Sequence, residues 1–341
     1  MLEKFKQLFL VESIAVDITS GNIIIYQQGN EKGKEIKINE PAVVISEEDG
    51  NKCIAKGEKA ETIKGISPEG IQFTNLVKTG IVAHSEYFEQ LMSSYISELY
   101  KNKRFLSFSP DVLAVVPEKT TMTNQKILIE SIDAAGAKNI DLVTSLIAAA
   151  NGLREHNDIT KASIIMHIGR DYSEVGIISL NKVHFSTSLN IGYVDFIRGI
   201  CEYIRNETDF VVGESNAEKA LLEIGTAFYI EAQDENQAIE VSGMLKRTSV
   251  PHKVTITKLE TFNAIRPTVE RLVSALLEVL EHTKEDMAED IHRHGIHIVG
   301  IGAKISRIDI AIESLGIKAR VAPNYLTAIA EGAGKIQKNR S

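Results

Sequence analysis

Two polar turns, one in each half of the chain, could bind the phosphate groups of a nucleotide. Each turn separates two apolar runs, so residues 14–25 and 164–175 both have the pattern of a β-hairpin. Chains with one such hairpin in each half often hold phosphates between the two turns. The first turn has small polar residues after Asp17, whereas the second carries the bulky side chains of Arg170 and Tyr172. Because phosphates bind close to the backbone, we expect the first turn to accept them and the second not to.

The elements that must position these turns alternate between strands and helices. After a helix at 85–100, a strand at 112–116, a helix at 123–135 and a strand at 140–143 indicate a β-α-β unit. The later elements are a helix from Ser145, strand 184–189, helix 194–205, helix 215–224 with Ser215 and Glu218 as a capping box, strand 253–257, a long helix broken or kinked at Pro267, strand 296–299, a helix from Lys304, strand 318–322 and an Ala-rich helix. This order is typical of an α/β protein.

Length and composition limit the class of protein further. A chain of 341 residues is long enough for two lobes of ordinary domain size. Its net charge of −8 argues against nucleic-acid binding, which needs a clustered basic face. Cys53 and Cys201 have no metal or redox spacing, so we expect two free thiols. No apolar run reaches the roughly 18 to 20 residues of a membrane span, and no secretion signal is evident, so we expect a cytoplasmic protein.

Several segments, in the same order, resemble the MreB family of bacterial actin-like cell-shape proteins. They are residues 38–44, 80–83, 134–138, 174–180, 213–218 with 223–225, and 326–332. The resemblance implies an α/β actin-like ATPase fold (ribonuclease H-like) with two lobes around a nucleotide cleft. It places lobe I at 1–143 plus about 313–341, with a smaller subdomain at about 30–75. Lobe II is expected at 144–312, with a smaller subdomain at about 190–250.

The resemblance also implies ATP with magnesium as the cofactor and assigns roles in the first turn. In the family this turn begins with an Asp that organises the metal ion and its water, and Asp17 occupies that position. Ser20, Gly21 and Asn22 would offer backbone N–H groups to the phosphates. Thr19 replaces a usual Gly. The alternative is a polar hairpin turn with no ligand.

The second turn departs from the family sequence Asp-Ile-Gly-Gly-Gly-Thr-Thr-Glu. His167 replaces the Asp and is a poor magnesium ligand, because magnesium prefers oxygen. Gly169 is retained, but the next residues are Arg170, Asp171 and Tyr172 in place of Gly, Gly and Thr. These changes argue against tight phosphate binding by this turn.

The position of the family's water-polarising Glu is also changed. This chain reads Thr144-Ser145 there, and a hydroxyl cannot act as a general base at neutral pH as a carboxylate can. The catalytic positions Thr144, Ser145 and Tyr172 therefore predict weak or absent ATP hydrolysis. Whether the chain is an enzyme stays open.

The adenosine side of the expected site is partly retained. Glu218 stands at the ribose-contacting position, while Leu221 replaces a Lys one helical turn later. Gly300 and Gly302 retain two glycines of the family's Gly-Gly-Gly turn before the last helix, and Gly302 and Ala303 could lie under a purine. The two glycines could equally mark the start of a helix.

Two apolar segments are candidate membrane anchors. Leu2, Phe5, Leu8 and Phe9 would share one face of a short N-terminal helix, as in an interfacial helix. Phe105-Leu106 lies in a loop that faces the membrane in the family. A frayed or core-docked N-terminus is the alternative for the first segment.

The resemblance predicts a cytoskeletal protein that forms or joins filaments on the inner face of the cell membrane and contributes to cell shape. Its expected partners are itself or a regular MreB, the inner membrane surface and membrane proteins of cell-wall elongation, with no nucleic acid. A working filament ATPase with compensated site residues is the first alternative. A small-molecule kinase of the same superfamily ranks last, because no catalytic base or substrate-binding insert is evident.

Overall fold

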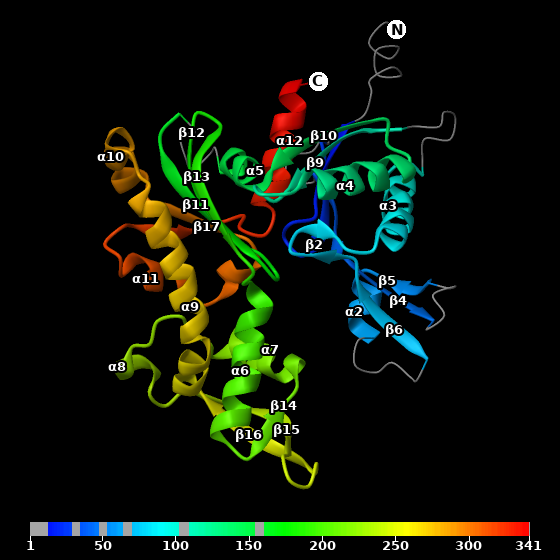
Figure 1. The fold of residues 1–341 in the computed structure, drawn as a ribbon. Coiled ribbons are helices and arrows are strands. Elements are labelled where there is room, and N and C mark those ends of the chain that lie inside the picture. The colour runs from blue at the N-terminus through cyan, green and yellow to red at the C-terminus, as the bar shows by residue number, and fades with distance from the viewer. Residues whose placement is uncertain are drawn as a thin grey trace, which may run out of the picture. The chain divides into compact units, whose positions relative to one another are not determined.

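The computed structural model describes residues 13–28, 35–47, 53–63, 70–101, 109–153 and 160–340 (Figure 1). It divides into two compact units. Unit 1 comprises the described residues of Met1–Asn157 and Thr327–Ser341, and unit 2 those of Asp158–Leu326.

Unit 1 is built on a five-stranded sheet in the order β10-β9-β1-β2-β3. Its strands are β1 (Ser13–Asp17), β2 (Asn22–Gln27), β3 (Ile36–Pro41), β9 (Asp111–Val116) and β10 (Asn139–Thr144). β1, β9 and β10 run parallel, whereas β2 and β3 are antiparallel to their neighbours. Because the carboxyl ends of parallel strands meet at one edge, Asp17 and Thr144 end their strands at the same edge of this sheet.

Smaller strands and helices complete unit 1. A three-stranded sheet contains β4 (Val43–Glu47), β5 (Cys53–Lys56) and β6 (Ile71–Asn75), and β7 (Val77–Lys78) pairs with β8 (Ile81–Val82). The helices are α2 (Glu58–Ile63), α3 (Ser85–Leu99), α4 (Met122–Ala134), α5 (Ser145–Gly152) and α12 (Ala328–Arg340). Phe88, Leu91 and Tyr95 of α3 are buried in the same core as Val16 and Val112 of the sheet.

Unit 2 repeats the sheet of unit 1. Its strand order is β13-β12-β11-β17-β18, with β11 (Ser163–Ile168), β12 (Ser173–Ser179), β13 (Lys182–Leu189), β17 (Ile296–Val299) and β18 (Ala319–Val321). β11, β17 and β18 run parallel, and β12 and β13 are antiparallel. The inward-facing apolar residues of β11 lie 150 positions after those of β1, so His167 is the counterpart of Asp17.

The remaining elements of unit 2 are mostly helical. A three-stranded sheet contains β14 (Phe210–Val212), β15 (Ala238–Leu245) and β16 (Pro251–Thr257). The helices are α6 (Tyr193–Glu207), α7 (Glu214–Glu223), α8 (Glu231–Asp234), α9 (Lys258–Glu281), α10 (Glu285–His294), the 3₁₀ helix η1 (Ile301–Lys304) and α11 (Ile308–Glu313). Within unit 2, α9 runs from the small sheet to α10 (Figure 1).

The division into units differs from the predicted boundaries at 143 and 313. Helix α5 belongs to unit 1 because it packs against α12 through small residues: a Cβ added to Gly332 would overlap the carbonyl oxygen of Ala148, and one on Gly152 would overlap that of Ala328. Residues 313–326 belong to unit 2 because β18 pairs with β17.

Two local predictions were wrong, and a third is decided between its alternatives only as to a break. Helix α7 begins at Glu214 with Gly213 as its N-cap, so Ser215 does not cap it. Helix α9 is not broken at Pro267, because the apolar residues on both sides of the proline are buried in one core. The predicted helix from Lys304 is instead η1 followed by α11, since Arg307 between them has a left-handed φ of 60°.

In the part of the chain that the structure describes, no helix is long and apolar enough to cross a membrane.

Candidate functional site

The first turn, between β1 and β2, is organised by its own carboxylate. Asp17 is fully buried, and its Oδ1 accepts hydrogen bonds from the Thr19 amide at 2.7 Å and the Thr19 hydroxyl at 2.6 Å. Its Oδ2 accepts one from the Ser20 hydroxyl at 2.7 Å. Burial raises the pKa of Asp17, and these hydrogen bonds oppose the rise. Thr19 therefore points into the turn and helps to hold its shape.

The turn can still offer oxygen to a cation. A carboxylate oxygen has two lone pairs, so the three hydrogen bonds leave acceptor capacity on Asp17. Gly21 has a φ of 94°, which favours glycine, and the Asn22 side-chain amide donates to Asn39 of β3 at 2.8 Å. The first turn is thus a fixed loop whose carboxylate fits a magnesium site.

The second turn, between β11 and β12, is closed by its own backbone and by helix α6. The Gly169 amide donates to the Tyr172 carbonyl at 2.9 Å. The carbonyls of Gly169 and Arg170 accept hydrogen bonds from the Tyr193 and Val194 amides, each at 2.9 Å. The first backbone amides of a helix can bind an anion. Here the amides of Tyr193 and Val194, at the start of α6, already donate to carbonyls of the second turn.

Helix α6 also approaches the second turn closely. A Cβ added to Gly192 would overlap backbone atoms of Arg170 and Asp171. The Ser173 hydroxyl donates to the Ile191 carbonyl at 2.7 Å, which fixes the strand after the turn. Asp171 therefore stands in a turn whose backbone is packed against protein on one side.

His167 is buried next to this turn in a neutral form. It is fully buried, and neither ring nitrogen has a hydrogen-bond partner among the described residues. Burial lowers its pKa to about 4, so the ring is uncharged at pH 7. The ring meets Tyr172 edge-on, with centroids 5.4 Å apart, and its Cδ2 lies beside Gly300. A neutral imidazole in this position does not fit a magnesium site.

Tyr193, which was not predicted, is influenced by two predicted site residues, Arg170 and Glu218. Tyr193 opens α6, and burial and the negative charge of Glu218 on α7 raise the pKa of its hydroxyl, while Arg170 lowers it. Arg170 of the second turn and Glu218 therefore both lie close enough to the Tyr193 hydroxyl to shift its pKa. Leu221, in contrast, is buried in the core. It is not a ligand-facing replacement for a lysine.

The glycines before α11 are required by packing against β11. Gly300 has a φ of 91°, and its amide donates to the Tyr325 carbonyl at 2.7 Å. A Cβ added to Gly302 would overlap the side chain of Ile168. Ala303 is buried. Close packing thus accounts for these glycines without a ligand.

Thr144 and Ser145 form the start of α5. Thr144 is the N-cap, but its hydroxyl makes no capping hydrogen bond, and the Oγ1 atom is buried with no hydrogen-bond partner among the described residues. Ser145 is fully buried. A buried hydroxyl at this edge of the sheet cannot supply the proton acceptor that a carboxylate would supply.

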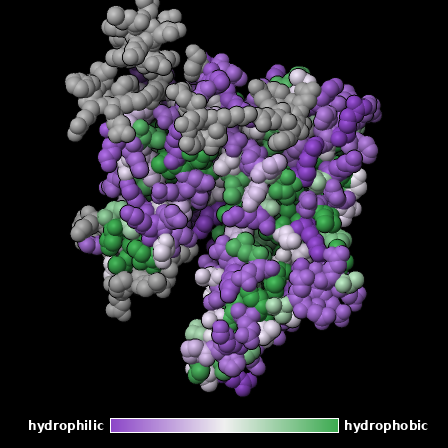
Figure 2. Space-filling model, turned by 180° about the vertical axis from the view of Figure 1, so that it is seen from behind, coloured by the Kyte–Doolittle hydropathy of each residue, from purple (hydrophilic) through white to green (hydrophobic). Residues whose placement is uncertain are grey.

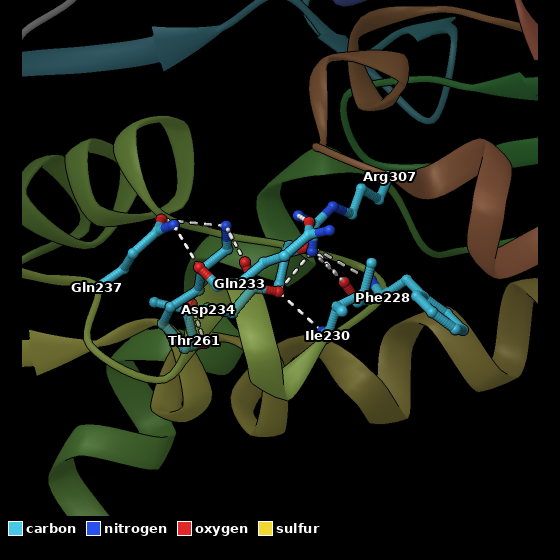
Figure 3. Close-up of polar contacts among 9 residues, drawn as sticks. Phe228, Ile230, Gln233, Asp234, Gln237, Thr261 and Arg307 are labelled. Atoms are coloured by element: carbon cyan, nitrogen blue, oxygen red, sulfur yellow. Dashed lines mark hydrogen bonds and ion pairs between the residues drawn. The ribbon is translucent and has the colours of Figure 1, made fainter.

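A buried ionic cluster in unit 2 was not predicted (Figure 3). Asp234 of α8 is fully buried and bridges two cations: its Oδ1 lies 2.9 Å from Lys258 Nζ, and its Oδ2 lies 2.5 Å from Arg307 Nη1. Arg307 also donates to the Phe228 carbonyl at 3.1 Å. The cluster joins the segment after α7 to the segment after η1 and to the start of α9.

Several predicted positions lie outside the described residues. They are Leu2, Phe5, Leu8, Phe9, Phe105 and Leu106, the candidate membrane residues. Within the described ranges, no three His, Cys, Asp or Glu side chains form a group that could hold a metal ion. Both cysteines of the chain are free thiols, as predicted.

Comparisons with known proteins identify the family. The family model for MreB/Mbl protein matches residues 11–341. The cell shape-determining protein MreB of Escherichia coli K12 is 32% identical over 340 residues, which cover 98% of this chain and 95% of that protein. The cell shape-determining protein Mbl of Bacillus subtilis is 28% identical over 327 residues, covering 96% of each chain.

Solved structures show the same fold. MreB5 of Spiroplasma citri bound to ADP aligns with a TM-score of 0.88 at 23% identity over 97% of each chain. The MamK double helical filament aligns with a TM-score of 0.77 at 10% identity, covering 96% of this chain and 98% of that one. The predicted actin-like α/β fold is confirmed, and the chain belongs to the MreB/Mbl family.

Proposed function

We propose that this chain is an MreB-type cytoskeletal protein that forms or joins actin-like filaments on the inner face of the cell membrane, contributes to cell shape and hydrolyses little or no ATP. The family and fold support the cytoskeletal role. The observation that carries the loss of hydrolysis is the second turn, where a neutral, buried His167 occupies the position in the sheet of unit 2 that Asp17 occupies in the sheet of unit 1. The hydroxyls of Thr144 and Ser145 support the same conclusion, since neither can act as the general base.

Nucleotide binding is part of this proposal. The related MreB5 of Spiroplasma citri has been solved bound to ADP and to AMPPNP. In this chain the backbone amides of Ser20, Gly21 and Asn22 would hold phosphate groups, Asp17 would hold the magnesium ion or its water, and Glu218 would hold the ribose. The first turn fits magnesium through its carboxylate oxygens, but the second turn does not, which supports weak or absent hydrolysis. Bound nucleotide would supply stability to the fold.

An active ATPase is the second candidate, and the first turn favours it. Asp17 is retained in a fixed loop with acceptor capacity left for a cation or its water. If another group polarises the attacking water, hydrolysis could proceed without a carboxylate at Thr144-Ser145. Replacing Asp17 distinguishes the candidates, because only an active enzyme would lose phosphate release.

Membrane attachment and partners complete the proposal. The apolar face of residues 2–9 and the Phe105-Leu106 segment would bind the inner membrane surface together, since two weak anchors on one molecule reinforce each other. The partner in filaments would be a second copy of this chain or a regular MreB. The relation to the MamK double helical filament supports assembly by this fold.

Three measurements on the purified full chain test the proposal. The nucleotide content of a heat extract shows whether ADP or ATP is bound. Sedimentation after addition of ATP and magnesium measures filaments, and phosphate release measures hydrolysis in the same sample. We expect pelleting with phosphate release at the level of a control without protein. A chain that does not pellet under any nucleotide or salt condition, alone or with a regular MreB, would contradict the filament role.

A further inference from the structure

A pocket in unit 1 lies between the three-stranded sheet β5-β4-β6 and helix α3. Its volume is about 310 Å³, which is within the range of sites that bind small organic molecules. Val44 of β4 and Leu91 of α3 line the pocket, and both side chains are almost fully buried. Ile54 of β5 also lines it and has an exposed fraction of 46%. The pocket therefore extends from buried apolar side chains to an apolar side chain at the surface.

The two faces of this sheet are covered by different helices. Successive side chains of a strand point to opposite faces. Val43 and Ile45 of β4 are packed with Ala60 of α2 on one face. Val44, which lies between them in the sequence, belongs instead to the core that contains Leu91 of α3. The pocket is therefore on the α3 face of the sheet.

The edge strand β5 has a bulge at the pocket. Among the described strands, β5 pairs with β4 alone. Ala55 pairs with Ile45, but the next pair is Cys53 with Ser46, so Ile54 has no partner in the ladder. A bulge redirects a side chain, and that of Ile54 is exposed at the pocket. Figure 2 shows apolar side chains gathered over this small sheet, at the left of the view.

Lys56 is the only charged residue among the described residues that line the pocket. It is half-buried, and its Nζ donates to the Ser94 hydroxyl and lies 5.8 Å from the centre of the Tyr95 ring. The Tyr95 hydroxyl donates to the Glu40 carboxylate at 3.0 Å, which holds Glu40 at the hydroxyl end of that ring. Lys56 itself makes no ion pair with any residue that the structure describes. A half-buried ammonium without a counter-charge is unfavourable, and an anion in the pocket would relieve this.

Two uncharged polar groups complete the lining. The side-chain amide of Gln90 on α3 makes no hydrogen bond within the described part of the chain, and it can both donate and accept. The exposed Cys53 thiol lies 3.6 Å from the Ala55 carbonyl oxygen. We assign the thiol no part in recognition, but its position makes it a reporter of whether the pocket is occupied.

We propose that this pocket binds a small organic acid, with its apolar body against Val44, Ile54 and Leu91 and its carboxylate beside Lys56 and Gln90. The apolar lining favours the body of the molecule, and the single cation favours its charge. A cationic molecule of the same shape would be repelled by Lys56. All of these residues belong to the small sheet and α3, so the inference does not depend on the proposed filament function.

The pocket lies beside the junction between the small sheet and the rest of unit 1. The chain enters β4 from β3 through Ala42, and it leaves β6 through Leu76, whose amide donates to the Ala42 carbonyl at 2.8 Å. The contact of Lys56 with Ser94 joins the sheet to α3. An acid in the pocket would contact both the sheet and the helix. It would therefore stabilise the folded chain, since it binds a site that the unfolded chain lacks.

Cys53 makes a direct test of binding possible. The chain has two cysteines, and Cys201 is buried, so iodoacetamide should react first with Cys53. We use octanoate as the probe, because it joins an apolar chain to a carboxylate. At about 10 mM, octanoate should slow the alkylation of Cys53 in the full chain about threefold or more. Mass spectrometry of the modified peptide follows the reaction, and Cys53→Ser gives the background from Cys201.

Two further probes separate the apolar body from the charge. Octylamine has the same chain with a positive end, and acetate has the carboxylate without the chain. We expect neither to slow the alkylation of Cys53. If octanoate gives no protection, or if octylamine protects as well as octanoate does, the proposal is overturned. This comparison uses only the parent chain, so it does not depend on whether a variant folds.

Substitutions of Lys56 test the origin of the selectivity. Lys56→Met keeps the length of the side chain and removes the charge, so octanoate should no longer protect Cys53. Lys56→Arg keeps the charge and should keep the protection. Lys59→Met removes an exposed lysine of α2 that is not among the lining residues, and we expect it to behave as the parent.

Thermal unfolding provides an independent measurement on the same proteins. Octanoate should raise the melting temperature of the parent, Lys56→Arg and Lys59→Met, but not that of Lys56→Met. The melting temperatures without octanoate show whether each variant is folded. A folded Lys56→Met variant that octanoate protects and stabilises as strongly as the parent would refute the assignment of Lys56 as the carboxylate-binding group.

Discussion

Replacing Asp234 by Asn should strongly destabilise unit 2. The carboxylate is fully buried between Lys258, whose side chain is 9% exposed, and Arg307, whose side chain is 19% exposed. Its Oδ2 also accepts the Ile230 amide at 2.8 Å (Figure 3). Asparagine keeps the size of the side chain but removes the negative charge. Two cations are then left together with no counter-charge.

The magnitude follows from the burial of the cluster. Removing one partner of a buried ion pair costs about 3–5 kcal/mol, because the remaining charge stays out of water. For a body of about 170 residues, each kcal/mol lowers the melting temperature by about 2–4 °C. We therefore expect the melting temperature to fall by about 6–20 °C. Thermal unfolding followed by circular dichroism measures this.

The loss of stability in Asp234→Asn should depend on pH, because the pKa of Asp234 is lower in the folded protein than in the unfolded chain. Burial raises this pKa, but hydrogen bonds from Lys258 and Arg307 lower it more, to about 2 from the usual 3.8. A lowered pKa in the folded state stabilises the fold above the unfolded pKa, and this contribution is lost as pH falls toward the folded pKa. The difference between the parent and Asp234→Asn is expected to be complete at pH 7 and to shrink below about pH 4.

An exposed ion pair of similar length is the control. Glu289 and Arg293 lie 2.8 Å apart on α10, with side chains 83% and 68% exposed. Glu289→Gln should cost less than about 1 kcal/mol, because water replaces the lost partner. Equal melting temperatures for Asp234→Asn and Glu289→Gln at pH 7 would refute the argument from burial.

Three further substitutions test separate parts of the account. Gly302→Ala should lower the free energy of unfolding by about 1–3 kcal/mol, since its Cβ would overlap Ile168, and an unchanged denaturation midpoint would contradict this packing. His167→Asp should raise the melting temperature in magnesium, relative to EDTA, by more than magnesium raises that of the parent, which has only the Asp17 carboxylate; an equal magnesium effect in the two proteins would contradict the argument that His167 prevents metal binding by the second turn. Phe5→Glu with Phe9→Glu should abolish liposome cosedimentation, as each buried Phe contributes roughly 1.5–3 kcal/mol, and equal pelleting would mean that this segment is not an anchor.

Strongly apolar segments made much of the fold predictable from the sequence. The runs of β1, β9 and β11 are buried along almost their whole length, and such continuous apolar runs are typical of strands inside an α/β protein. The two hairpins were predicted because each turn lies between two such runs. The parallel pairing of β9 and β10 confirmed the β-α-β unit.

The failures have specific physical causes. β15 was missed although Ile239, Val241 and Leu245 alternate with exposed residues, because Gly243 interrupts the apolar positions of this short alternation. The start of α11 was misplaced because a left-handed conformation at Arg307 is rare for a residue with a Cβ, and nothing in the sequence indicated it. The N-cap of α7 was predicted at Ser215 but is Gly213, because Gly213 is the last residue with extended backbone and the helix begins at the next residue, Glu214.

The candidate site was predictable in residue types but not in contacts. The sequence shows that Asp17 is retained and that His167 is not a carboxylate. It does not show that Asp17 binds its own turn or that His167 is buried against Tyr172. The Asp234 cluster joins residues that are 24 and 73 positions apart, and no local pattern links them.

The central claim is that this MreB-family chain assembles without hydrolysing ATP. Phosphate release and sedimentation measured on one sample with ATP and magnesium test it most directly. We expect protein in the pellet and phosphate release equal to that of a control without protein. Phosphate release that rises with protein concentration and is abolished by Asp17→Ala would contradict the claim and would establish an active filament ATPase instead.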